Sequence, residues 1–296
     1  MTNSTSSRPV PILVVGMNRS GTKWLSNELS AHPGIVSVQD TRHTGILETN
    51  MLWAMDRKFD LRSDEDYVGL VEMWSKTDFF QITGQSKEDL FYDVEQRPET
   101  ATAMFRTLMD AFARSNDADF WLQKTSPLVA LDTTSELDDA RIVVIRRNLM
   151  DNLRSRIQHS RNRVGRASIV RAVGIYALEE KAMDRLEQRR PSVSVAYEDM
   201  RGDVDATLRP AWRFLGLEPP GSNEYPWRRN TSFSKDQDRE EVFTSAQKTS
   251  IRILYETLSR LPFAGLRRAY ELAGRRVPPM VRGTFSRLRQ DIDGDA

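Results

Sequence analysis

The chain has 296 residues, with 43 basic and 42 acidic side chains, a formal net charge of +1 and no cysteine. This balance of charge argues against bulk nucleic-acid binding, and the lack of cysteine excludes disulfides, thiolate metal sites and cysteine nucleophiles. The scattered histidines predict no metal cluster. Residues 1–8 are polar, which predicts a disordered tail and no signal peptide, so we expect a cytoplasmic protein with a single domain over 1–296.

The first elements alternate between strand and helix. The apolar run Pro11–Gly16 predicts a strand buried on both faces. A helix is expected over Thr22–Ala31, where the following His-Pro-Gly ends it. Ile35–Val38 then predicts a second, short strand.

Residues 44–116 predict a helical insertion, because apolar side chains recur there at helical spacing. Ser63 and Asp66 resemble a capping box, and Pro98 stands where another helix is expected to begin. Two interpretations are open. The insertion is either a lid or acceptor-binding element, or a helical layer that covers the sheet.

The remaining strands and helices continue the alternation. The predicted strands are Phe120–Gln123, Arg141–Ile145 and Val193–Ala196. The predicted helices are Asn148–Arg161, Ser168–Arg189 and Asp203–Gly216, before a polar loop and a helical C-terminal third. Strands that alternate with helices predict an α/β fold, a parallel sheet flanked by helices.

The segment Gly16-Met-Asn-Arg-Ser-Gly-Thr-Lys23 lies between a strand and a helix, as phosphate-binding loops do. The Walker A pattern ends in Gly-Lys-Ser/Thr, whereas here Thr22 precedes Lys23. The loop cation is therefore Arg19, and Lys23 need not reach the phosphates. The strand that ends at Ile145 continues into two arginines and lacks the aspartate that would hold Mg²⁺ in an NTPase.

At these residues the chain resembles the sulfotransferases that use 3′-phosphoadenosine 5′-phosphosulfate (PAPS). The segments that carry the resemblance, in family order, are Arg19-Ser-Gly-Thr-Lys-Trp-Leu25, Lys124-Thr-Ser-Pro127, Arg147-Asn-Leu-Met-Asp-Asn-Leu-Arg-Ser155 and Tyr197-Glu-Asp-Met200. The resemblance covers roughly 11–230 and implies a P-loop-NTPase-like sulfotransferase fold. Departures include Lys23, where the family has a second Thr or an Arg, and Asn148-Leu149 in place of Asp-Pro.

The resemblance also implies roles for these residues. The 5′-phosphosulfate is expected at Arg19, Ser20, Gly21, Thr22, Lys23 and Trp24, and the 3′-phosphate at Arg147 and Ser155. Lys124 is a second catalytic cation or a solvated strand-end lysine. Tyr197 is a nucleotide contact or a core tyrosine with a bonded hydroxyl. Arg228, Arg229 and Asn230 lie in a polar loop that either closes over the nucleotide or stays solvated.

The base that accepts the acceptor's proton has more than one candidate. Asp40-Thr-Arg42 resembles the tyrosylprotein sulfotransferase branch, in which a glutamate at the Asp40 position is the base. His43 is the second candidate, because histidine titrates near neutral pH and the cytosolic branch uses one. Glu48 is the third.

The basic C-terminal segment 263–290 predicts helices packed on the domain with arginines outward, or weak contact with an anionic membrane surface. The expected co-substrate is PAPS, with 3′-phosphoadenosine 5′-phosphate (PAP) as product and no metal. The acceptor, a small molecule, glycan, lipid or peptide, is not specified by any motif. The competing functions are a P-loop kinase or NTPase and a non-catalytic nucleotide-binding protein.

Overall fold

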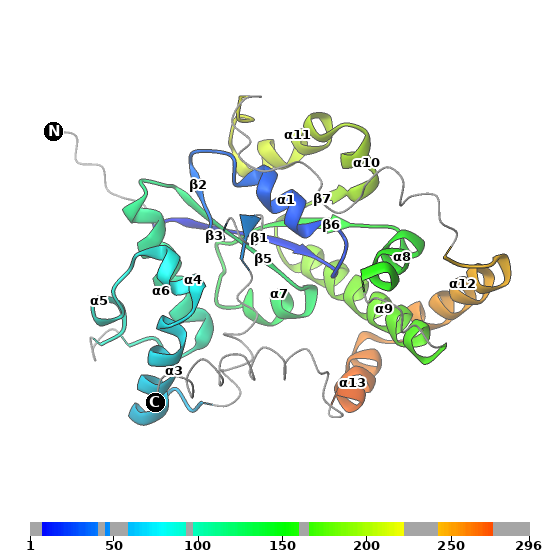
Figure 1. Ribbon diagram of the computed structural model, residues 1–296, viewed down its shortest axis with the longest axis horizontal. Coiled ribbons are helices and arrows are strands. Elements are labelled where there is room, and N and C mark those ends of the chain that lie inside the picture. The colour runs from blue at the N-terminus through cyan, green and yellow to red at the C-terminus, as the bar shows by residue number, and fades with distance from the viewer. Residues whose placement is uncertain are drawn as a thin grey trace.

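A parallel β-sheet forms the centre of the computed structural model, which describes residues 8–40, 45–47, 59–92, 97–159, 166–221 and 242–274. Within these residues the sheet has five strands in the order β2-β5-β1-β6-β7, each parallel to its neighbours. Helices lie on both faces of the sheet, and further helices lie at its two ends (Figure 1). The predicted α/β fold is confirmed.

The strands are the predicted apolar segments with shifted ends. They are β1 (Val10–Gly16), β2 (Ile35–Val36), β5 (Phe120–Thr125), β6 (Arg141–Arg146) and β7 (Ser192–Ala196). Strand β1 lies between β5 and β6, so residues 11–16 are buried on both faces. The predicted length of the second strand is wrong. Pairing with β5 ends at Val36, and the Ser37 hydroxyl then donates a hydrogen bond to Ser30 at the end of α1.

The helices that cover one face of the sheet are α1 (Thr22–Leu29), α10 (Tyr197–Gly202) and α11 (Val204–Leu215). Leu25 of α1 and Trp212 of α11 pack there with Val14 and Ile145 from the sheet. The expected ends of α11 are confirmed, since Asp203 caps its start and Gly216 ends it in the left-handed conformation. Helix α10, which follows β7 directly, was not predicted.

The helices on the other face are α6 (Ala101–Ser115), α7 (Pro127–Thr133) and α9 (Arg166–Arg189). Phe105 of α6 and Met183 of α9 share an apolar cluster with Leu13 and Val144 of the sheet. Helix α7 was not predicted, although the Ser126 hydroxyl caps it in the ordinary way. Its seven residues are too few for helical periodicity to be recognised.

The described part of the helical insertion contains α3 (Asp64–Ser75), α4 (Asp78–Thr83) and α5 (Lys87–Phe91) before α6. The expected start at Pro98 is wrong, because the Thr100 side chain caps α6 at Ala103. Ser63 caps α3 as predicted, but the Asp66 carboxylate accepts from the Asp60 amide and not from Ser63. Apolar residues of all four helices share one cluster with the sheet, so these helices cover it.

A short antiparallel hairpin corrects the prediction of helix from Thr44 onward. Strands β3 (Gln39–Asp40) and β4 (Gly45–Ile46) pair with each other, and the hairpin lies against α1. The Asn27 side chain of α1 accepts a hydrogen bond from the Ile46 amide at 3.2 Å. Gly45 has φ 123°, and a β-carbon there would lie 2.2 Å from the Asn27 side-chain oxygen, so only glycine fits this contact.

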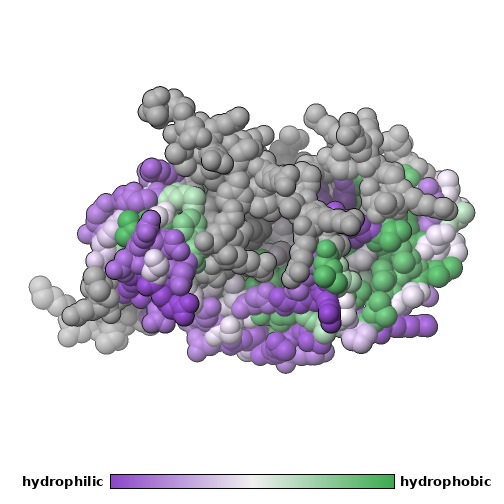
Figure 2. All heavy atoms as spheres, turned by 90° about the horizontal axis from the view of Figure 1, so that it is seen from below, coloured by the Kyte–Doolittle hydropathy of each residue, from purple (hydrophilic) through white to green (hydrophobic). Residues whose placement is uncertain are grey.

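The C-terminal helices α12 (Ser245–Ser259) and α13 (Phe263–Gly274) pack on α9. Leu266 is buried against Ala177 and Leu178 of α9, and Arg267 pairs with Asp132 of α7. The described part of the basic segment is thus a packed helix. Figure 2 shows hydrophobic residues gathered at the end of the molecule that carries these helices. No helix in the described ranges is long and apolar enough to cross a membrane.

Candidate active site

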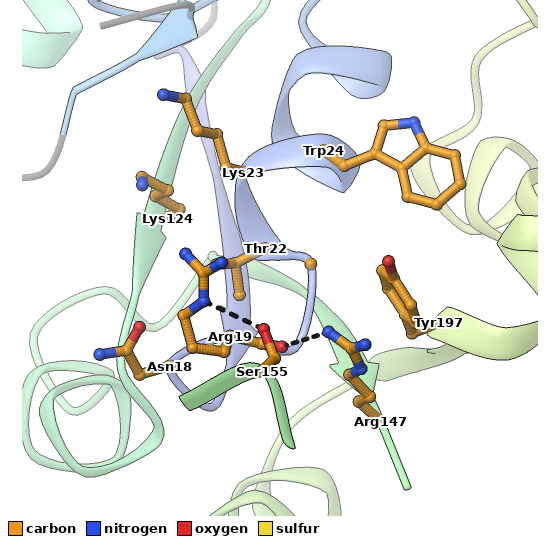
Figure 3. A pocket seen from close by; sticks show the side chains of 10 residues that line it. Asn18, Arg19, Thr22, Lys23, Trp24, Lys124, Arg147, Ser155 and Tyr197 are labelled. Carbon is orange, nitrogen blue, oxygen red and sulfur yellow. Dashed lines mark hydrogen bonds between the residues drawn. The ribbon is translucent and has the colours of Figure 1, made fainter. Parts of the chain in front are cut away.

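A cleft of about 170 Å³ lies at the carboxyl ends of β1, β5, β6 and β7 (Figure 3). The predicted residues that line it are Arg19, Gly21, Thr22, Lys23, Trp24, Lys124, Arg147, Ser155 and Tyr197. Because all these strands are parallel, the segments that follow them meet at one edge of the sheet, where ligands of open α/β sheets bind. The fold therefore brings together residues that are far apart in the sequence.

The loop between β1 and α1 depends on Gly21. Its φ of 97° lies in the left-handed region, and a β-carbon would stand 2.5 Å from the Tyr197 ring. Arg19 is also left-handed, with φ 70°. Such a loop, which continues directly into the first turn of α1, is typical of anion sites in which backbone N–H groups and a helix N-terminus act together.

Ser20 lies at the back of this loop and does not line the cleft. It is fully buried, and both its hydroxyl and its amide donate to the Met17 carbonyl, at 2.6 and 3.0 Å. Its side chain therefore closes the turn. The predicted contact of Ser20 with a ligand finds no support in the position of its hydroxyl.

Arg19 points into the cleft, and its Nε donates to the Ser155 hydroxyl at 3.2 Å. In the part of the chain that the structure describes, no carboxylate pairs with this guanidinium. Burial lowers the pKa of Arg19, and Tyr197 opposes that shift. A buried cation without an anionic partner is costly, so the site favours a bound anion.

Arg147 is buried beside Arg19, with 5% of its surface exposed. Its Nη1 donates to the Arg19 carbonyl at 2.9 Å, and its guanidinium carbon lies 4.1 Å from the centre of the Tyr197 ring. The Tyr176 hydroxyl donates to the Arg147 carbonyl at 2.8 Å and fixes the backbone. Burial lowers the pKa of Arg147, and the charge of Arg19 adds to that shift.

Ser155 reaches the cleft from α8 (Leu149–His159), the helix that follows Arg147. Helix α8 is anchored at its start, where the Asn148 amide donates to the Glu198 carboxylate at 3.0 Å. Glu198 belongs to the Tyr-Glu-Asp segment, so two of the recognised motifs contact each other directly. The Ser155 hydroxyl accepts a hydrogen bond from Arg19 of the phosphate-type loop.

Trp24 and Tyr197 form an aromatic wall, with ring centres 5.8 Å apart in an edge-to-face arrangement. The Trp24 indole donates to Glu28 at 2.8 Å. Tyr197 is buried in the apolar cluster on this face of the sheet, as a core tyrosine would be, but its hydroxyl has no hydrogen-bond partner in the described part of the chain. In Figure 3 this wall lies on the same side of the loop as Arg147, opposite Lys124.

Lys124 and Lys23 lie on the other side of the cleft (Figure 3). Lys124 is the fifth residue of β5, and only 8% of its surface is exposed, so it is not a solvated strand-end lysine. Lys23 also lines the cleft, despite its place one residue further into α1 than a Walker lysine.

Of the three base candidates, the structure describes only Asp40. Asp40 is buried in β3, on the hairpin that packs against α1, and does not line the cleft. His43, Glu48 and the loop residues Arg228, Arg229 and Asn230 lie outside the described residues.

The sequence analysis missed Asn18 and Asn152. Asn18 lines the cleft beside Arg19, and its place in the loop was a signal that could have found it. Asn152 is fully buried on α8, and its side chain donates to the Asn18 carbonyl at 3.1 Å. Asn152 lies within the Arg147–Ser155 motif, but at a variable position of it, and it carries no charge that would mark it in the sequence.

The cleft thus combines four cationic side chains, a phosphate-type loop and an aromatic wall. Guanidinium groups suit phosphate oxygens, and an aromatic face suits a planar base. Among the described residues, no group of three or more histidine, aspartate or glutamate side chains is arranged to hold a metal ion.

Solved structures share this fold at low sequence identity. The sulfotransferase domain of the Synechococcus PCC 7002 olefin synthase matches with a TM-score of 0.53 and 19% identity, over 88% of this chain and 99% of that domain. The sulfotransferase STF1 of Mycobacterium tuberculosis gives a TM-score of 0.51 and 16% identity, over 86% of this chain and 78% of STF1. The sulfotransferase domain of the curacin biosynthetic pathway gives a TM-score of 0.50 and 17% identity, over 86% of this chain and 100% of that domain.

Comparison with curated proteins gives no match. The family described as "Sulfotransferase family" matches residues 11–220, most of the chain and all the elements that form the cleft. This family implies PAPS as the donor. The chain therefore belongs to the sulfotransferase family and is an enzyme of sulfuryl transfer.

Proposed function

We propose that this sulfotransferase binds PAPS in the cleft and transfers its sulfuryl group to a hydroxyl or amine of the acceptor. The observation that carries the proposal is the pair of buried arginines, Arg19 and Arg147, which meet at the phosphate-type loop. Their lowered pKa values reflect burial, a cost that phosphate groups of the donor would offset.

Each end of the donor has its own set of residues. Arg147 and Ser155 bind the 3′-phosphate, and their proximity through Arg19 supports this assignment. The loop amides, Arg19 and Lys124 bind the 5′-phosphosulfate. Trp24 and Tyr197 contact the adenine, and the Tyr197 hydroxyl, buried without a partner among the described residues, is free to bond to the nucleotide.

The reaction breaks the bond between sulfur and the bridging phosphate oxygen, and forms a bond between sulfur and the acceptor oxygen or nitrogen. Arg19 and Lys124 stabilise the negative charge that develops on the departing phosphate, because they are fixed in place before the reaction begins. The acceptor loses a proton in the same step, and Asp40 is the proposed base. Asp40 is buried on a hairpin packed against the helix that carries Lys23 and Trp24, which both line the cleft.

The finer assignments stay predictions. Residues 228–230 are proposed to close over the nucleotide, and the helical insertion is proposed to contribute to the acceptor site. The acceptor is a small molecule, glycan, lipid or peptide. Cytoplasmic location, metal independence and weak membrane contact through 263–290 are likewise predictions from the sequence.

A kinase is the less favoured function. The cation of the loop is Arg19, and the chain continues after β6 into Arg147, where an NTPase would present an acidic metal ligand. Both features place positive charge where Mg²⁺ would have to bind.

Calorimetry with PAP and with adenosine 5′-phosphate, which lacks the 3′-phosphate, tests the proposal. We expect Arg147→Ala to weaken PAP binding by about 1.5–3 kcal/mol and to change binding of adenosine 5′-phosphate much less. Arg146→Ala is the matched control, because Arg146 pairs with Asp184 and Glu187 outside the cleft. An equal loss for both nucleotides would remove the 3′-phosphate role from Arg147. In a thermal-shift experiment, a rise in the melting temperature of the wild type with ATP and Mg²⁺ but not with PAP would favour the kinase.

A further inference from the structure

Helix α8 holds two successive carbonyl groups of the phosphate loop. The Asn152 side chain on α8 donates to the Asn18 carbonyl at 3.1 Å, and Arg147, just before α8, donates to the Arg19 carbonyl at 2.9 Å. A planar trans peptide points its N–H away from its C=O. The bond from Asn152 therefore also sets the direction of the Arg19 N–H.

The orientation of the Asn152 amide is itself determined. Its Oδ1 accepts from Arg156 Nε at 2.7 Å, so the Nδ2 group must face the loop. Arg156 also donates through Nη2 to the Glu179 carboxylate on α9, at 3.1 Å. A continuous chain of hydrogen bonds thus runs from Glu179 through Arg156 and Asn152 to the carbonyl of Asn18.

This hydrogen-bond network is buried at Asn152 and largely buried at its other members. Asn152 is fully buried, and the side chains of Arg156 and Glu179 are 17% and 11% exposed. A buried ion pair is seldom a net gain over apolar packing, which makes an additional role for these residues reasonable. This hydrogen-bond network reaches the cleft at two points. Asn18, whose carbonyl it binds, lines the cleft, and Ser155, which also lines it, lies next to Arg156 on α8.

We propose that Asn152, Arg156 and Glu179 are positioning residues that lock the phosphate loop against α8 and α9 in the geometry that binds the donor. None of them lines the cleft, so each acts through the loop. The loop geometry can be measured in the free protein. The expected effect on donor binding also rests on the proposed function.

Hydrogen exchange in the ligand-free protein tests the lock directly. Asn152→Asp keeps the side-chain shape and the contact with Arg156, but it places a carboxylate oxygen against the Asn18 carbonyl. We expect amides in a peptide spanning residues 17–21 to exchange at least tenfold faster, with the rest of the chain unchanged. Exchange in this peptide at the wild-type rate would overturn the proposal, whether or not PAP binds.

Calorimetry with PAP gives the second measurement. Asn152→Asp and Glu179→Ala are each expected to weaken PAP binding at least tenfold, and Glu179→Gln, which keeps an acceptor for Arg156, should recover most of the loss. Glu180→Gln is the matched control, since Glu180 on the same helix accepts from Tyr255 of α12. If Asn152→Asp does not fold, the two Glu179 variants carry both measurements. Wild-type affinity in Asn152→Asp and Glu179→Ala would overturn the inference, whereas failure of the wild type to bind PAP would overturn only the proposed function.

Discussion

Arg146 and Arg147 are neighbours in the sequence, yet the fold gives them opposite roles. Successive residues of an extended chain point to opposite sides. Arg146 is turned to α9, where burial is outweighed by Glu187 and Asp184, so its pKa is raised. Arg147 is turned to the cleft, where burial dominates and its pKa is lowered. One arginine is therefore part of the framework outside the cleft, and the other lines the cleft.

The residue-scale prediction concerns the base. Asp40→Asn should keep PAP affinity but lower turnover about 10²–10⁴-fold, because the amide is nearly isosteric and cannot accept the proton. Turnover is measured with labelled PAPS and an acceptor found by screening, and affinity by calorimetry. The acid limb of the pH–rate profile should disappear if it reports this carboxylate.

His43→Gln is the matched comparison and should be mild. An Asp40→Asn enzyme with near-normal turnover, together with an inactive His43→Gln enzyme, would transfer the role to His43. If both variants stay active, Glu48 becomes the next candidate.

At the scale of elements, polar contacts fix helix α6 on the sheet. Asp110 of α6 accepts from Trp121 of β5 at 2.7 Å and from Arg8, just before β1, also at 2.7 Å. Arg106, one turn earlier, donates through both terminal nitrogens to Asp139 ahead of β6, at 2.6 Å each. These contacts tie the helix to the starts of the strands whose other ends form the cleft.

The element-scale prediction is a pH-dependent loss of stability in Asp139→Asn. Burial would raise the pKa of Asp139, but the Arg106 hydrogen bonds outweigh it and the pKa is lowered. A lowered native pKa adds stability that is present above the unfolded value and is lost as pH falls through the native value. We expect the variant to lose about 1 kcal/mol of unfolding free energy at pH 7, since solvent screens this partly exposed carboxylate.

The difference between wild type and variant should shrink as the pH falls below about 4. Denaturant unfolding at several pH values measures both effects. Asp138→Asn, at the exposed neighbouring position, is the control and should show neither. A difference that stays constant down to pH 2 would show that the Arg106 pair is not its origin.

At the scale of the whole molecule, the cleft collects positive charge although the chain is nearly neutral. Arg19, Lys23, Lys124 and Arg147 come from different segments and converge at one edge of the sheet. Elsewhere in the described part of the molecule, acidic side chains pair with arginines of their own, as in the pairs formed by α6 and α9. We therefore expect these cationic side chains to neutralise the phosphates of the donor.

The prediction at this scale is that turnover persists in EDTA. Cationic side chains already occupy the places from which Mg²⁺ would act on the phosphates. The assay uses labelled PAPS, with a magnesium-dependent kinase in the same buffer as a control for chelation. If EDTA abolished turnover and Mg²⁺ restored it, the role of the cationic side chains would be contradicted and kinase chemistry would be favoured.

The sequence by itself determined the α/β class, the phosphate loop and most of the cleft residues. These depend on local signals, such as apolar runs typical of a buried strand and a glycine, Gly21, in the loop between a strand and a helix. Arg19, Lys124 and Arg147 were predicted from their positions at or just after strand ends, together with the resemblance of their segments to the sulfotransferase motifs.

Only the tertiary structure decided how these residues meet. The Arg19–Ser155 bond, the turn of Ser20 away from the cleft and the hold of Asn152 on the loop join segments over a hundred residues apart or depend on the loop's own closure. The β3–β4 hairpin likewise depends on Asn27 of α1. Periodicity and motif spacing describe neighbours along the chain, whereas these contacts arise when helices pack on the sheet, which is why no local pattern contains them.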